Sequence, residues 1–179
     1  MTDQMIGLLP NLRAFALSLT NNPIRADDLV QDTFLRAWAS RTYFQPGTNL
    51  GAWMFKIMRN SLYTAHRKLS REVQNPNGSF AAHLAAPPGQ EAAVALTEVA
   101  HALARLSGAH REALLLMSLD GMSYEEVALV QGIAVGTVKS RVHRAREQLA
   151  KLLQIEDWHR IGHDWVMEAA LQVRTDPSL

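Results

Sequence analysis

The sequence predicts an all-α protein made of two small helical domains joined by a flexible linker. Apolar residues recur at helical spacing through most of the chain, and no stretch of useful length alternates as a strand would. Residues 73–90 contain no Lys, Arg, Asp or Glu, yet carry three prolines and two glycines, which is typical of a linker. A length of 179 residues allows one or two domains at roughly 100–200 residues each.

The domain boundaries follow from that linker. Residues 1–72 are expected to form the first domain, 73–90 the linker, 91–153 the second domain and 154–179 a C-terminal helical extension. The apolar residues of the extension have near-helical spacing, which favours packing on the second domain, with binding to a partner as the alternative. They are Ile155, Trp158, Trp165, Val166 and Ala169.

Helices are expected in the first domain over residues 5–19, 24–40 and 50–70, with Pro46-Gly47 marking a turn in 41–49. The middle helix has two distinct faces. One is a stripe expected to be buried, formed by Val30, Thr33, Phe34, Ala37 and Trp38. The other carries the more polar set Asp28, Gln31, Asp32 and Leu35.

Charge is distributed unevenly in this nearly neutral chain, whose formal net charge is +1. Residues 53–71 contain five Lys or Arg and no acid, and residues 139–151 contain five against Glu147 alone. Two basic islands indicate two contacts with a polyanion. The alternative is that they are two solvated helix faces.

Composition excludes several other classes. The chain has no cysteine, so disulfides, thiolate metal sites and cysteine nucleophiles are excluded, which fits a cytoplasmic protein. No long apolar run predicts a membrane span, and the first residues lack the basic start of a secretory signal. His159 and His163 have a metal-ligand spacing, but Arg160 stands where a zinc protease helix has Glu. We therefore expect no catalytic residue, metal, cofactor, small-molecule substrate or membrane partner.

Residues 122–151 predict a helix-turn-helix. Ser123 can cap the first helix, and Glu126 three residues later completes a capping box. Gly132 stands where the turn needs a residue that tolerates positive φ. The second helix is expected to begin near 134–137 and to bury Val138, Val142, Ala145 and Leu149.

The outer face of that second helix is basic and polar. A helix of this kind can enter the major groove, where Lys, Arg and Ser reach base edges and phosphates. A charged surface helix is the alternative, and the motif alone does not distinguish an activator, repressor, transposase or polymerase subunit. The candidate duplex-binding residues are Thr137, Lys139, Ser140, Arg141, His143, Arg144 and Arg146.

Three stretches together resemble the bacterial RNA polymerase sigma factors of the extracytoplasmic-function type, group IV. They are ADDLVQDTFLRAW (26–38), FQPGTNLGAWMFKIMRNSLYTAHRK (44–68) and MSYEEVALVQGIAVGTVKSRVHRARE (122–147). They occur in the family's order and at its distances. The wording FQPGTNLGAW is similar to the subgroup that directs the general stress response in alphaproteobacteria.

The resemblance implies a role for each surface. Asp28, Gln31, Asp32 and Leu35 would dock on core RNA polymerase. The loop 44–49 would shape a pocket for a flipped base. Trp53 and Phe55 could add aromatic surface, but they lie on different sides of the helix, so at least one of them is expected in the core. The second domain would read the upstream promoter element as duplex. The residues implied in capturing the melted strand of the downstream element are Trp53, Lys56, Arg59, Asn60, Tyr63 and Arg67.

The family further implies sequestration by an anti-sigma factor. Two alternatives stay open. One is a plain helix-turn-helix regulator, against which the first basic island with its aromatic residues argues. The other is a sigma-like mimic that binds an anti-sigma factor and no DNA, in which the basic residues Lys139, Arg141 and Arg144 would be superfluous.

Overall fold

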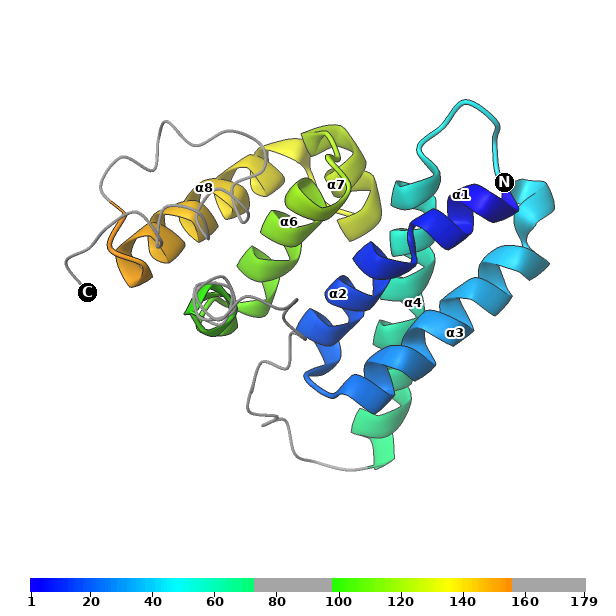
Figure 1. Ribbon diagram of the computed structural model, residues 1–179, viewed down its shortest axis with the longest axis horizontal. Coiled ribbons are helices and arrows are strands. Elements are labelled where there is room, and N and C mark those ends of the chain that lie inside the picture. Colours follow the sequence, from blue (N-terminus) through cyan, green and yellow to red (C-terminus); the bar gives the residue numbers. More distant parts are fainter. Residues whose placement is uncertain (73–97, 156–179) are drawn as a thin grey trace, which may run out of the picture.

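The computed structural model describes residues 1–72 and 98–155, and within these ranges it is helical with no strand (Figure 1). The predicted all-α class is confirmed. The linker 73–90 and nearly all of the extension 154–179 lie outside the described residues. In chain order the elements are α1 (Thr2–Gly7), α2 (Leu9–Thr20), α3 (Pro23–Ala39), the 3-10 turn η1 (Arg41–Tyr43), α4 (Leu50–Glu72), a helical segment at 98–104, α6 (Gly108–Leu119), α7 (Tyr124–Gln131) and α8 (Val135–Leu152).

The first expected helix, 5–19, is two helices in the structure. Pro10 lies in the first turn of α2, where backbone N–H groups have no partner within the helix, so the absence of an N–H in proline costs no hydrogen bond. A proline inside one continuous helix would have removed a backbone hydrogen bond. The chain therefore ends α1 at Gly7 and begins α2 at Leu9.

The turn from α2 to α3 is encoded by Asn21-Asn22-Pro23. Asn21 takes the left-handed conformation (φ 62°) that ends α2, which Asn tolerates better than most residues. Asn22 then caps α3 by accepting a hydrogen bond from the N–H of Arg25 at 3.1 Å. Pro23 begins α3 with φ already suited to a helix.

α2, α3 and α4 pack together around Phe15 and Phe55, whose rings meet edge to face with centroids 5.1 Å apart. Phe55 is fully buried and offers no aromatic surface to DNA, which confirms that at least one of Trp53 and Phe55 belongs to the core. Trp38 was expected in the buried stripe of α3 but is 49% exposed. Residues spaced by three and four shift gradually around a helix of 3.6 residues per turn. Trp38, at the end of the stripe, therefore lies on the outer face beside Leu35.

The second half is built on α6, which buries Leu114, Leu116 and Met117. Ser107 caps this helix by accepting a hydrogen bond from the N–H of His110 at 3.3 Å. α8 crosses α6 and α7 through the predicted inner stripe, and all four of its members are buried. That expectation is confirmed.

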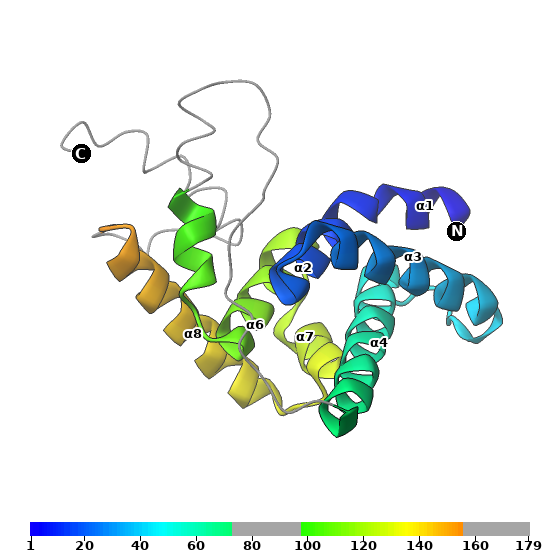
Figure 2. The same ribbon diagram turned by 90° about the horizontal axis from the view of Figure 1, so that it is seen from below.

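The two halves pack directly against each other. α7 lies along α4 and α6 lies along α2, as both views show (Figures 1 and 2). The buried apolar side chains of the two halves form one continuous cluster. The Asn11 amide on α2 also donates a hydrogen bond to the carbonyl of Leu119 at the end of α6. The described chain is therefore closed, with its two halves in contact.

None of the helices within the described residues combines the length and apolar character that a membrane span requires.

Candidate functional site

The outer face of α3 combines apolar and acidic groups. Leu35 is 71% exposed, and Asp28 and Gln31 are exposed beside it. Asp32 accepts a hydrogen bond from Arg36 Nε at 2.7 Å, so Arg36 partly neutralises it. Trp38 adds an exposed ring whose face lies 4.7 Å from the Arg41 guanidinium. Large exposed apolar groups framed by charge are typical of a protein-binding surface.

A second surface runs along α4. The heptad spacing of five predicted residues places them on one stripe of the helix; they are Trp53, Lys56, Asn60, Tyr63 and Arg67. Lys56, Asn60 and Tyr63 are exposed. Arg67 lies on α4, but its side chain falls outside the described residues. The described members of the stripe offer a cation, an amide and a tyrosine ring, which are groups that hold single strands.

Trp53 is only partly exposed because the loop 44–49 before α4 packs against it. The ring of Phe44 lies 5.3 Å from the Trp53 ring, tilted by 51°. Thr48 donates a hydrogen bond to the carbonyl of Gln45 at 2.8 Å, and Gly47 takes φ +90°. Trp53 thus supports the loop 44–49 and holds it next to the α4 stripe.

Arg59 lies at the edge of this stripe and turns toward the second half of the chain. Its Nε donates to Glu112 Oε1 on α6 at 2.5 Å, and its guanidinium lies 4.5 Å from the Tyr63 ring centre. Glu112 is only 3% exposed. Burial raises the pKa of Glu112, an effect that Arg59 and, more weakly, Arg141 oppose.

The helix-turn-helix is formed by α7 and α8 as predicted. Ser123 accepts from the N–H of Glu126 at 3.2 Å, and Glu126 accepts from the N–H of Ser123 at 2.8 Å. Gly132 ends α7 in the left-handed region, with φ 68° and ψ 39°. α8 then begins at Val135. The capping box, the turn glycine and the helix start are all confirmed.

Five of the seven candidate residues on α8 are exposed, namely Thr137, Lys139, Ser140, His143 and Arg144. Lys139 reaches across to α7, where its ammonium lies 5.7 Å from the Tyr124 ring centre. Ser140 donates to the carbonyl of Gly136 at 2.7 Å, which leaves its lone pairs available to a donor. The first turns of α8 therefore present cationic and hydroxyl groups outward.

Arg141 and Arg146 differ from the other five because both are partly buried. Arg141 donates to Gln131 Oε1 on α7 at 3.1 Å. The Arg146 Nε is buried and has no hydrogen-bond partner among the described residues. Both side chains are directed at least partly toward the protein, so their contribution to a DNA surface is smaller than their charge alone suggests.

Sequence reasoning missed three features of these surfaces. Trp38 joins the α3 face, and Glu112 and Asp120 reach from the second half onto α4. An acid inside the apolar run HREALLLM (110–117) is the signal that could have singled out Glu112, since a buried carboxylate needs a partner. No local pattern identifies Asp120.

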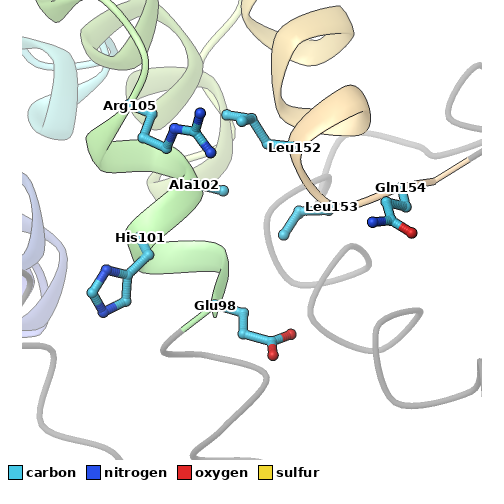
Figure 3. A pocket seen from close by; sticks show the side chains of 7 residues that line it. All are labelled: Glu98, His101, Ala102, Arg105, Leu152, Leu153 and Gln154. Carbon is cyan, nitrogen blue, oxygen red and sulfur yellow. The ribbon is translucent and has the colours of Figure 1, made fainter. Parts of the chain in front are cut away.

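A hollow lies away from these surfaces, between the segment 98–105 and the end of α8 (Figure 3). Glu98, Ala102 and Arg105 face Leu152 and Leu153 across it. Gln154 takes φ +55° there, and Ile155 packs against the core. The remaining apolar residues of the predicted extension, and also His159 and His163, lie outside the described residues.

Comparison with known proteins identifies both halves. Residues 7–72 match Sigma-70 region 2, and residues 96–149 match Sigma-70, region 4. The ECF RNA polymerase sigma factor EcfG of Rhodopseudomonas palustris (strain TIE-1) is 47% identical over 169 residues, which cover 94% of this chain and 93% of that protein.

Solved structures give the same result. The sigma factor RpoE of Bartonella quintana, crystallised with the anti-sigma factor NepR, is 44% identical, with a TM-score of 0.74 over 87% of this chain and 97% of that one. CnrH, in complex with the cytosolic domain of CnrY, is 28% identical, with a TM-score of 0.59 over 87% of this chain and 88% of that one.

The matches to Sigma-70 region 2 in one half and to Sigma-70, region 4 in the half that carries the helix-turn-helix define a transcription initiation factor of the sigma class. More specifically, the chain belongs to the ECF RNA polymerase sigma factor family. It is an alternative sigma factor that directs core RNA polymerase to promoters.

Proposed function

We propose that this chain divides promoter recognition between residues 1–72 and 91–153, with 73–90 as the linker between the two domains. The first domain docks on core polymerase and captures the melted strand of the downstream element. The second domain reads the upstream element as duplex. The chain itself does not polymerise RNA, which is the task of the core enzyme. It acts in the cytoplasm, where the core enzyme acts.

The observation that carries this proposal is the separation of three chemically different faces. The α3 face is apolar and acidic, which suits a protein partner. The α4 stripe presents Lys56, Asn60 and Tyr63, which suits a single strand. The first turns of α8 present Lys139 and Arg144 beyond a capped helix-turn-helix, which suits the major groove.

Anti-sigma control is the second part of the proposal. RpoE and CnrH, both similar in structure, were solved with an anti-sigma factor and with the cytosolic domain of CnrY, respectively. Their likeness supports sequestration of this chain by an anti-sigma protein. The resemblance of residues 44–53 to the general stress response subgroup supports release under stress.

Transcription with single substitutions tests the division of labour. Arg144→Ala removes a cation from the proposed duplex surface and should weaken promoter recognition while core binding stays unchanged. Lys151→Ala is the matched control, because it removes a cation from the last turn of the same helix, where Lys151 pairs with Glu147 at 3.0 Å. Equal loss of core binding and promoter recognition in Arg144→Ala would contradict the assignment.

Adding a purified anti-sigma protein of the NepR class to the same assay tests the second part. We expect transcription to fall as the anti-sigma protein approaches equimolar amounts. Undiminished transcription, with no complex seen by gel filtration, would contradict control by a factor of this class.

A further inference from the structure

The hollow beside the end of α8 combines an apolar lining with a charged rim (Figure 3). Ala102 is buried in its wall, and Leu152 and Leu153 are half-buried opposite. Glu98 and Arg105 are exposed at the rim. The cavity volume is about 310 Å³, which is at the lower end for small-molecule pockets. A hollow whose charged groups lie at the rim suits a large apolar side chain better than a polar small molecule.

α8 ends at this hollow in a turn that redirects the chain. Gln154 takes the left-handed conformation with φ 55°, and the N–H of Ile155 donates to the carbonyl of Ala150 at 3.0 Å. This combination is the Schellman motif, which ends a helix and commonly brings the next apolar residue back onto it. Ile155 accordingly packs against the core. Because Gln154 also lines the hollow, the tail, residues 156–179, begins at its edge.

The sequence of the tail continues the apolar pattern that Ile155 begins. Its apolar residues recur at spacings that place them on one side of a helix of 3.6 residues per turn. Arg160 and Asp164 fall on the opposite side. Two tryptophans on one side form a large apolar patch, which needs a surface to cover it. The stripe consists of Ile155, Trp158, Trp165, Val166 and Ala169.

We propose that residues 156–169 fold back from this turn as an amphipathic helix that seats Trp158 in the hollow, against Leu153, with Trp165 on the same side. The tail then completes the apolar core at the end of α8. It fixes the far end of the helix whose first turns present Lys139 and Arg144. The inference does not depend on what those first turns bind.

The chain's own tail is the occupant because it is joined to the edge of the hollow. A tethered segment has an effective concentration of the order of millimolar at a site within its reach. A separate protein or a second copy of the chain would have to be present at a comparable concentration to replace it. The tail also supplies the large apolar side chains that the lining of the hollow requires.

Fluorine NMR of the full chain measures the docking directly. Fluorotryptophan gives separate resonances for the four tryptophans. The chain has no cysteine, so His101→Cys places a nitroxide label at the exposed rim of the hollow. A nitroxide broadens the resonances of nuclei close to it. We expect Trp158 and Trp165 to broaden, while Trp38 on α3 stays sharp as the internal reference.

Glu125→Cys is the matched control label. Glu125 is exposed on α7, which contacts the first half of α8 through Tyr124 and Lys139 and through Gln131 and Arg141. A label there should leave Trp158 and Trp165 sharp. Sharp resonances of both tail tryptophans with the label at position 101 would overturn the proposal.

Mixing two chains distinguishes the chain's own tail from the tail of a second copy. One chain carries the label at position 101 and no fluorine, and the other carries fluorotryptophan and no label. We expect no broadening in the mixture. Broadening in the mixture as strong as in the singly labelled, fluorinated chain would show that the tail docks on a second copy, which would overturn the proposal.

Thermal unfolding tests the packing through a pair of substitutions on opposite sides of the tail. Trp158→Ala should lower the midpoint by about 5 °C, whereas Arg160→Ala should change it by less than about 2 °C. Adding Leu153→Ala to Trp158→Ala should cost less than the sum of the two single losses, because the two side chains share one contact. Equal midpoints for Trp158→Ala and Arg160→Ala, or fully additive losses with Leu153→Ala, would overturn the seating of Trp158 in the hollow.

Discussion

The turn between α7 and α8 sets how the second helix of the motif is presented, and Gly132 makes that turn possible. Its φ of 68° lies in the left-handed region, where a Cβ approaches the following carbonyl. No other group lies within 4 Å of a methyl at this position. Gly132→Ala therefore costs only the backbone conformation, about 1 kcal/mol.

That cost should lower the thermal midpoint by about 2–4 °C for a chain of this size. Gly136 is four residues further along, in α8, and it also has open space around a methyl group. Because its backbone is helical, Gly136→Ala should raise stability by about 0.5 kcal/mol. Gly132→Asn should fall between native and Gly132→Ala, since Asn tolerates the left-handed region.

Differential scanning calorimetry of the four proteins checks this reasoning. The same chemical change should produce shifts of opposite sign at positions 132 and 136. Shifts of the same sign at both positions would refute the argument from backbone conformation.

Four further outcomes follow. Arg144→Ala should reduce the slope of log affinity against log salt for duplex promoter DNA by about 1, measured by anisotropy at several salt concentrations; an unchanged slope would mean that this side chain meets no phosphate. Leu35→Ala should change stability by less than about 0.5 kcal/mol, because the residue is 71% exposed, yet should weaken core polymerase binding about tenfold in a competition assay. Asn60→Ala should slow promoter opening in permanganate footprints and leave upstream binding intact. The pKa of Glu112 is raised in the folded chain, so the folded state keeps the Glu112 proton to higher pH than the unfolded state does. The free energy of unfolding of the native chain, compared with that of Glu112→Gln, should therefore be greatest at acid pH and should fall as pH rises through the folded pKa. Urea unfolding at several pH values measures this difference.

Local signals encoded much of the fold. Ser123, Glu126 and Gly132 could be identified from the sequence because a capping box and a positive-φ glycine depend on neighbours along the chain. The stripe from Val138 to Leu149 was identifiable for the same reason, as helical period alone determines which side is buried. The break at Pro10 was also local, but the apolar pattern running through it suggested one helix.

The contacts between the halves could not be predicted in that way. Arg59 and Glu112 are separated by 53 positions, and nothing in either local pattern pairs them. Trp38 was misplaced because a stripe of period 3.6 drifts, and only packing decides which end of it stays inside. The position of the Asp120 carboxylate over Gly51 depends on how α6 meets α4, which is a tertiary property.

Transcription in vitro shows whether this chain selects promoters for core RNA polymerase. Core RNA polymerase, this chain and a library of randomised promoters would be combined, and the transcript starts sequenced. We expect discrete starts behind a shared two-part element, whose upstream part is selected less strongly with Arg144→Ala and equally well with Lys151→Ala. Absence of discrete starts, with the chain bound to core polymerase, would contradict it.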